Sequence, residues 1–158
     1  MTRRQYLLHV LHEALLTTVP QGINVRKTFV MSQHKSYPRP FAKAEIMAES
    51  FENEREESSA LMLGNFDGSV QFGIYAGVEI AVQDTNDEAT LEQETERVLE
   101  ILTNAVHAFD YQDKVLDNGA TLIIRNVYVT GLVPAVLDNE MQGNLLIEGI
   151  IEYSHYQP

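Results

Sequence analysis

The sequence predicts an α+β fold, in which an antiparallel sheet of long hairpins is packed by two helices. The clearest sign of the sheet is the stretch SVQFGIYAGVEIAVQD at 69–84, where apolar residues occupy every second position. Helical spacing of apolar residues near the N-terminus, and again in the acidic segment after residue 87, predicts the two helices. Turn residues between strand-like segments indicate the hairpins.

The N-terminal segment predicts an amphipathic helix that ends before Pro20. Its apolar side chains share one stripe at helical spacing: Leu7, Leu8, Leu11, Ala14 and Leu15. The longest apolar runs of the chain, such as 132–137, fall far short of the roughly 20 residues that a bilayer-spanning helix needs. We therefore expect no membrane partner.

The next part of the chain mixes strand-like and turn-like sequence. Residues 23–31 alternate loosely and predict a strand. The Pro-containing arm at 32–43 predicts a loop, because its two prolines disfavour regular structure inside a sheet. Residues 44–51 suit either a strand or a short helical turn. The acidic linker at 52–59 is a solvated charge run that cannot contribute to a core.

The central hairpin is predicted from residues 60–64 and 69–84, which flank Asn-Phe-Asp-Gly at 65–68. The Asp-Gly pair supplies the residues that a tight turn requires. We expect the apolar side of the long strand to contact the helices: Val70, Phe72, Ile74, Ala76, Val78, Ile80 and Val82. On its other side, Gly73 and Gly77 indicate either close approach by a partner or a bulge or twist within the sheet.

Residues 87–110 predict the second helix. Apolar or small residues recur along one side (Leu91, Thr95, Val98, Leu102, Ala105, Val106, Phe109), and carboxylates crowd the start, where the helix dipole favours negative charge. The turn at 117–119 is followed by strands at 120–131 and 144–156, which predict a second antiparallel pair. Because no repeat or second core is visible, we expect a single domain over 1–158.

Recognised catalytic and cofactor motifs do not occur in this sequence. The chain has no cysteine, no phosphate-binding GxxxxGK[ST] loop, no GxGxxG and no GxSxG. Its histidines are scattered, and only His9 and His12 are close enough to share a helix face. We therefore predict a protein that is not an enzyme and that has no cofactor and no metal.

Charge is distributed unevenly along the chain. Residues 1–43 carry seven basic residues and one acidic residue (+6), whereas residues 44–158 carry four and twenty-two (−18), which together give the net charge of −12. A generic nucleic-acid binder is disfavoured by this total. A basic patch on one copy facing an acidic patch on the next would instead form a head-to-tail interface, which closes into a ring if the rotation permits.

The layout as a whole resembles the tail terminator proteins of long-tailed bacteriophages. The resemblance lies in the N-terminal helix, the long central hairpin, the acidic helix entered through VEIAVQDTNDEATLEQETERVLEILTNAV, and the closing hairpin that ends in LLIEGIIEYSHYQ. It covers nearly the whole chain as a pattern, without a motif. Its packing positions correspond here to Val78, Ile80, Val82, Leu91, Val98 and Leu102.

The resemblance implies a structural function. It implies α+β subunits that form a hexameric ring, which caps the tail tube, ends tail polymerisation and joins the tail to the head connector. The implied partners are other copies of the chain, the tail tube protein, the head connector or neck protein, and DNA passing through the lumen. The implied location is the tail–neck junction of the virion, after assembly in the host cytoplasm. The resemblance transfers no catalytic residue.

Candidate interface residues follow from two physical arguments. Aromatic side chains contribute much of the energy of protein contacts, and basic side chains can face an acidic neighbour or DNA. The candidates are Arg26, Lys27, Lys35, Tyr37, Arg39, Phe41, Lys43, Phe51 and Tyr75.

Three other functions remain open from the sequence. A related head–tail connector or tail tube protein would have a similar fold, but it would bind at another position in the virion or would polymerise. A small-molecule-binding regulatory domain would need a concave apolar pocket with a few polar groups. An enzyme of unfamiliar type would bring carboxylates or histidines together only in the folded chain.

Overall fold

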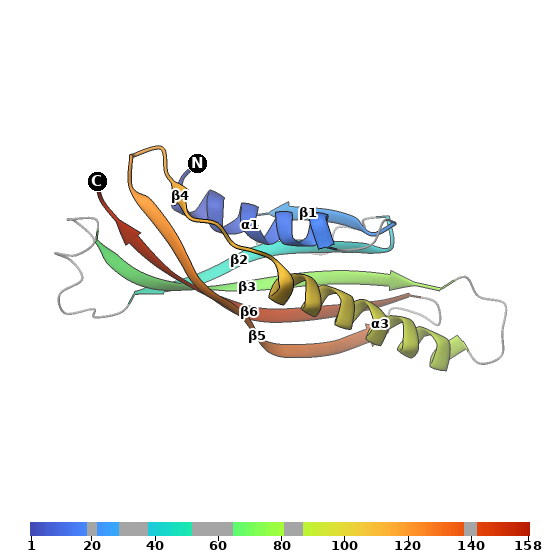
Figure 1. The fold of residues 1–158 in the computed structure, drawn as a ribbon. Helices are drawn as coiled ribbons and strands as arrows, with labels where there is room; N and C mark the ends of the chain where they lie inside the picture. Colours follow the sequence, from blue (N-terminus) through green and yellow to red (C-terminus); the bar gives the residue numbers. More distant parts are fainter. Residues whose placement is uncertain (19–21, 29–37, 52–64, 81–86, 138–141) are drawn as a thin grey trace.

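The computed structural model describes residues 1–18, 22–28, 38–51, 65–80, 87–137 and 142–158, and it shows an α+β fold. Its elements are α1 (Arg3–Thr18), β1 (Asn24–Thr28), β2 (Phe41–Phe51), β3 (Phe66–Glu79), α3 (Asp87–Ala108), β4 (Lys114–Val115), β5 (Thr121–Leu137) and β6 (Gln142–Tyr156). The strands form one curled sheet, and both helices lie on the same face of it (Figure 1). The fold class predicted from the sequence is confirmed.

The strand order in the sheet is β1-β2-β3-β6-β5-β4. The sequence predicted antiparallel pairing, and this holds for every neighbouring pair except one. At one edge, β1 runs parallel to β2, with Asn24 opposite Phe41 and Thr28 opposite Glu45. Strand β5 pairs with β6 along its length, with register shifts after Ile124, after Val129 and after Val133.

The core lies between the helices and the sheet. As predicted, α1 buries its leucine stripe, and β3 buries one side. The buried side chains are Leu7, Leu8, Leu11 and Leu15 of α1, Val70, Phe72, Ile74, Ala76 and Val78 of β3, and Leu91, Val98 and Leu102 of α3. Ile80 packs against this core in part, while Val82 lies outside the described residues.

The prediction that the arm at 32–43 is a loop is wrong for its last three residues. Phe41, Ala42 and Lys43 begin β2, which continues through the segment 44–51 that the sequence left open. The two prolines precede this strand, so they do not prevent pairing of Phe41 with Gly77 on β3. The acidic linker at 52–59 lies outside the described residues.

The predicted tight turn at Asp67-Gly68 is also wrong. Both residues lie within β3 and pair with β6, Gly68 opposite Tyr153 and Asp67 opposite Ser154. A glycine is required here for a different reason, since a Cβ at Gly68 would lie 2.5 Å from the Tyr153 hydroxyl oxygen. The segment 60–64 lies outside the described residues, and the antiparallel partners of β3 are β2 and β6.

The second helix and the second hairpin are confirmed. Helix α3 covers most of the predicted span. The turn after β4 closes through hydrogen bonds from Leu116 N to Ala120 O (2.8 Å) and from Gly119 N to Leu116 O (2.9 Å). Gly119 has φ 83°, a conformation that glycine adopts without strain.

Candidate assembly surfaces

Four of the predicted interface residues meet on the outer face of the sheet, the face opposite the helices. Lys43 lies opposite Tyr75, and Phe41 lies next to Tyr75 with ring centroids 5.8 Å apart. Arg39 lies over the Phe41 ring at 5.7 Å. Arg39, Phe41 and Lys43 belong to the arm predicted at 32–43, whereas Tyr75 comes from β3.

Two of these four side chains are buried within the subunit. Phe41 is 2% exposed and Lys43 is 1% exposed. The ammonium group of Lys43 lies 3.1 Å from the carboxylate of Glu45, which is also buried. Phe41 and Lys43 therefore contribute to the packing of their own chain.

Arg39 connects the end of the arm to two strands. Its guanidinium donates hydrogen bonds to the carbonyl oxygens of Val78 (3.2 Å) and Gly143 (2.7 Å), and to Oδ1 of Asn144 (2.8 Å). A planar guanidinium suits this arrangement because its donors diverge in one plane. Arg39 thus fastens the start of β2 to β3 and β6.

The other predicted interface residues lie in different places. Arg26 is exposed on β1, whereas the side chain of Lys27 and the whole of Lys35 and Tyr37 lie outside the described residues. Phe51 is half-buried near the helix-covered face, where its ring meets Phe66 edge-on at 5.3 Å. The predicted set is thus distributed over both faces of the sheet and one edge.

Arg3 and Arg4 are paired within the chain as well. The carboxylate of Glu49 lies 3.0 Å from the Arg3 guanidinium and 3.5 Å from that of Arg4, and it accepts a hydrogen bond from the Tyr153 hydroxyl. Burial and the neighbouring Glu49 raise the pKa of Tyr153 above its ordinary value. The role of Glu49 could not be predicted from the sequence, because a register shift between Ile46 and Glu49 turns this carboxylate toward the helices.

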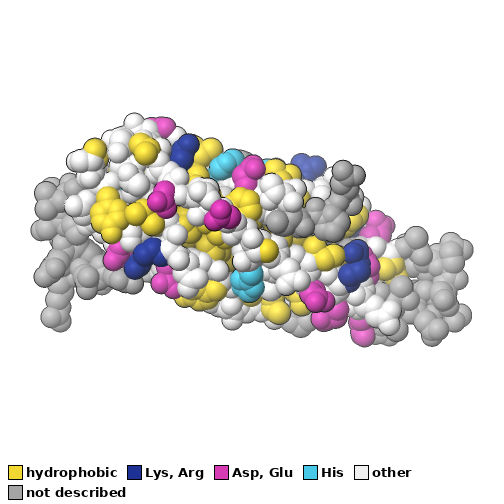
Figure 2. Space-filling model, viewed as in Figure 1, with side chains coloured by type: hydrophobic (Ala, Val, Ile, Leu, Met, Phe, Trp, Pro, Cys, Tyr) yellow, Lys and Arg dark blue, Asp and Glu magenta, His cyan; other side chains and the backbone are white. Residues whose placement is uncertain are grey.

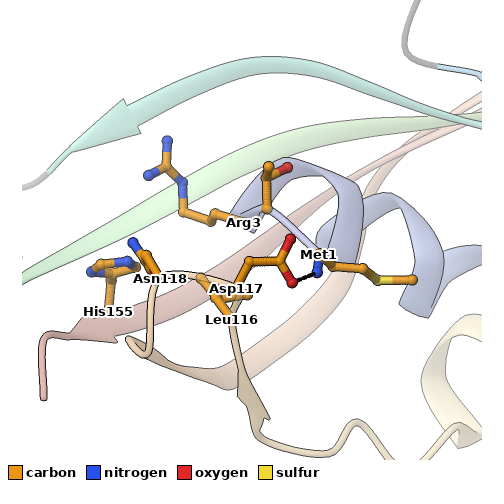
Figure 3. A pocket seen from close by; sticks show the side chains of 7 residues that line it. Met1, Arg3, Leu116, Asp117, Asn118 and His155 are labelled. Atoms are coloured by element: carbon orange, nitrogen blue, oxygen red, sulfur yellow. Dashed lines mark hydrogen bonds and ion pairs between the residues drawn. The ribbon is translucent and has the colours of Figure 1, made fainter.

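A hollow of about 260 Å³ lies at the end of the molecule where α1 begins, and Figure 3 shows the side chains that line it. Its charged groups are already paired: the Met1 ammonium with Asp117, and the Arg3 guanidinium with Glu49. His155 lines the same hollow, and its buried ring stacks on Phe66 with centroids 4.7 Å apart. This hollow joins α1, the β4–β5 turn and the end of β6.

A second hollow, of about 540 Å³, lies along α3 beside β5; we call it the α3–β5 groove. Its lining consists of Gln93, Glu96, Arg97, Leu99, Glu100, Thr103, Asn104 and Leu132. Leu132 is 47% exposed, although its partner in the register, Ile147, is buried. This groove could not be identified from the sequence, which shows the apolar run at 132–137 but not the exposure of Leu132.

The outward edge of β5 borders this groove. Strand β4 pairs only with Thr121 and Leu122, so from Ile123 onward no described strand pairs with β5 on that side. At one point the edge is occupied by a side chain, because the Val129 amide donates to Nε2 of His107 on α3 (3.3 Å). A sheet edge with unpaired backbone groups is a place where another chain can bind.

The charges on the described surface are mostly acidic. Figure 2 shows the helix-covered face, where acidic side chains are spread over both ends and the middle. On the outer face, Glu79 and Glu148 are exposed. These carboxylates do not favour phosphate binding. DNA contact therefore remains a prediction.

Within the described ranges, no three histidine or carboxylate side chains gather as metal ligands. Neither described helix is long and apolar enough to cross a bilayer. Comparison with protein-family models and with curated proteins finds no match to this chain.

Proposed function

We propose that this chain is a structural subunit of the phage tail terminator type, which assembles as a closed ring, caps the tail tube and joins it to the head connector. The observation that carries the proposal is the open sheet. One face is covered by α1 and α3, while in the described part of the chain both sheet edges lack a partner strand. A subunit with two unlike edges can bind copies of itself head to tail, which produces a ring when the rotation closes.

The long strands support the same proposal. Strands β3, β5 and β6 have 14, 17 and 15 residues, and the ion pairs of Glu49 and the contacts of Arg39 hold the sheet in one shape. A rigid subunit is needed because small errors in the angle between copies would prevent closure. The layout that resembles tail terminators supplies the identity of the partners: the tail tube protein and the head connector or neck protein.

The test is the native mass of the purified protein by light scattering, followed by negative-stain microscopy. The expected result is one closed ring with a fixed number of subunits, whose population falls as salt is added, because unlike charges contribute to the contact. Open filaments would favour a tail tube protein instead. A monomer at low salt and high protein concentration would contradict the proposal.

A further inference from the structure

We propose that the α3–β5 groove receives the β1 edge of a second copy of this chain. The inference rests on the proposed function and names the two surfaces that would meet. Both lie at the ends of the strand order, β1 at one edge of the sheet and β5 close to the other, where only the two-residue β4 follows it.

The α3–β5 groove contains apolar side chains that the subunit buries only in part. Leu132 belongs to the helix-covered side of β5, yet nearly half of its surface is exposed, and Leu99 on α3 is only half-buried. Between them, Oγ1 of Thr103 is buried and has no hydrogen-bond partner among the described residues. A further strand beside β5 would bury the two leucines. This gain in buried apolar area is the main driving force for association.

Strand directions allow the second copy to supply that strand. Strands β1, β2 and β6 run in one direction, and β3 and β5 run in the opposite direction. A copy displaced sideways along the sheet therefore places its β1 antiparallel to β5 and keeps its helices on the same face. The half-buried Ile23 and Val25 at the β1 edge would then lie beside Leu132.

The register shifts of β5 limit how the two edges can pair. Only Gly131, Leu132 and Val133 keep a regular register between the shifts after Val129 and after Val133. A strand as short as β1, with five residues, suits such a short stretch. Most of the contact would thus come from side chains, with few backbone hydrogen bonds.

Charge selects β1 as the occupant. The rim of the groove carries Glu96 and Glu100, both exposed, whereas the guanidinium of Arg97 is held by Glu94 at 2.9 Å. On the outer face, the Glu148 carboxylate lies over Gly131, 3.9 Å from where a Cβ would stand. Strand β1 (NVRKT) has two basic residues and no carboxylate. A two-fold contact of β5 with β5 would instead bring equal acidic rims together, which is unfavourable.

Disulfide trapping tests this contact, because the chain has no cysteine of its own. We would mix Leu132→Cys subunits with differently tagged Val25→Cys subunits and oxidise them mildly, because both side chains lie on the helix-covered side of the sheet. The expected product is a mixed disulfide that exceeds either homodisulfide several-fold. The control replaces Val25→Cys with Val115→Cys, which is 64% exposed on β4 and should give little mixed product. A dominant Leu132→Cys homodisulfide would show the two-fold contact and overturn the inference.

Light scattering on the same mixtures separates the inference from the proposed function. Closed rings without the mixed disulfide would place the contact elsewhere and overturn the inference, while the proposed function would stand. A monomer at every concentration would overturn both.

A charge swap gives an independent result. Glu148→Lys and Arg26→Glu, both on the outer face, should each weaken assembly by about two- to five-fold, as exposed ion pairs do. Combining the two should restore assembly in part, whereas Glu79→Lys at the end of β3 should not restore the Arg26→Glu variant. Additive losses in the double variant would contradict a direct contact, provided that circular dichroism shows all variants folded.

Discussion

The hydroxyl of Tyr153 on β6 donates a hydrogen bond to the carboxylate of Glu49 on β2, across the intervening strand β3. The same carboxylate pairs with Arg3 and Arg4 at the start of α1. One buried acidic side chain thus joins two strands and a helix, and Gly68 on β3 leaves room for the Tyr153 ring.

Glu49→Gln should lower the free energy of unfolding by about 2 kcal/mol, because it removes charged hydrogen bonds from a side chain that is only 8% exposed. Urea unfolding followed by circular dichroism measures this change. Glu92→Gln is the matched control, since Glu92 is exposed on α3 and should change stability little. Equal effects of the two substitutions would contradict the role given to Glu49.

Gly77→Ala should destabilise the protein by about 1–3 kcal/mol, as overpacking does. Its new Cβ would overlap the buried Phe41 ring and lie 2.8 Å from the Arg39 guanidinium. Gly73→Ala is the control, because the nearest atoms, on Leu146 and Met47, would be 3.4 Å away. Thermal unfolding of both variants should show a clear loss only for Gly77→Ala.

Lys43→Glu should destabilise the fold by about 3–5 kcal/mol, because it places a second carboxylate beside buried Glu45. Loss of assembly in this variant would then reflect loss of the folded subunit. The exposed Arg26→Glu serves as the comparison and should unfold close to wild type. A folded, stable Lys43→Glu protein would show that the Lys43 side chain is more accessible than the structure indicates.

Stability should fall above about pH 10, where phenols ionise in the unfolded chain. Burial raises the pKa of Tyr111, and burial together with Glu49 raises that of Tyr153. Below the unfolded pKa both states keep the protons, so this contribution is fully present; it is lost as pH rises through the folded pKa values. The fall should reach up to about 1.4 kcal/mol per pH unit for each tyrosine. Urea unfolding at about pH 8 and about pH 11 measures it, and Tyr111→Phe should make the fall shallower.

His107→Ala should speed hydrogen exchange at the Val129 amide by up to about tenfold, because that amide loses its acceptor. Nuclear magnetic resonance exchange measurements would detect this. Amides between β3 and β6 are the internal reference and should exchange at the wild-type rate. An unchanged Val129 amide would show that His107 does not protect this edge.

Short sequence patterns, such as alternation of apolar residues and turn residues, predicted individual strands and turns correctly where the structure depends on neighbouring residues alone. The alternation at 69–84 identified the buried side of β3, and Asp-Asn-Gly at 117–119 identified the turn before β5. The two-residue strand β4 on the other side of this turn was not predicted. The prediction of a turn at Asp67-Gly68 was wrong because Asp-Gly is typical of tight turns, whereas Gly68 is needed here for close packing against Tyr153. No local feature distinguishes the two.

The candidate surfaces were harder to predict, because they depend on partners distant in sequence. Lys43 and Arg39 were predicted to face an acidic neighbour or DNA, yet they contact Glu45, Gly143 and Asn144 of their own chain. The exposure of Leu132 could not be predicted from the sequence, because it depends on the position of β5 near the edge of the sheet.

The position of β6 has a consequence for biosynthesis. It is the last strand along these 158 residues, yet it lies in the middle of the sheet between β3 and β5. Helix α1, made first, is also fastened by late residues, since the Tyr6 hydroxyl donates to the Gln112 carbonyl (2.7 Å). The sheet therefore cannot close on the ribosome until β6 has emerged, and such non-local pairing is slow. Nascent chains that lack β6 should therefore depend on chaperones.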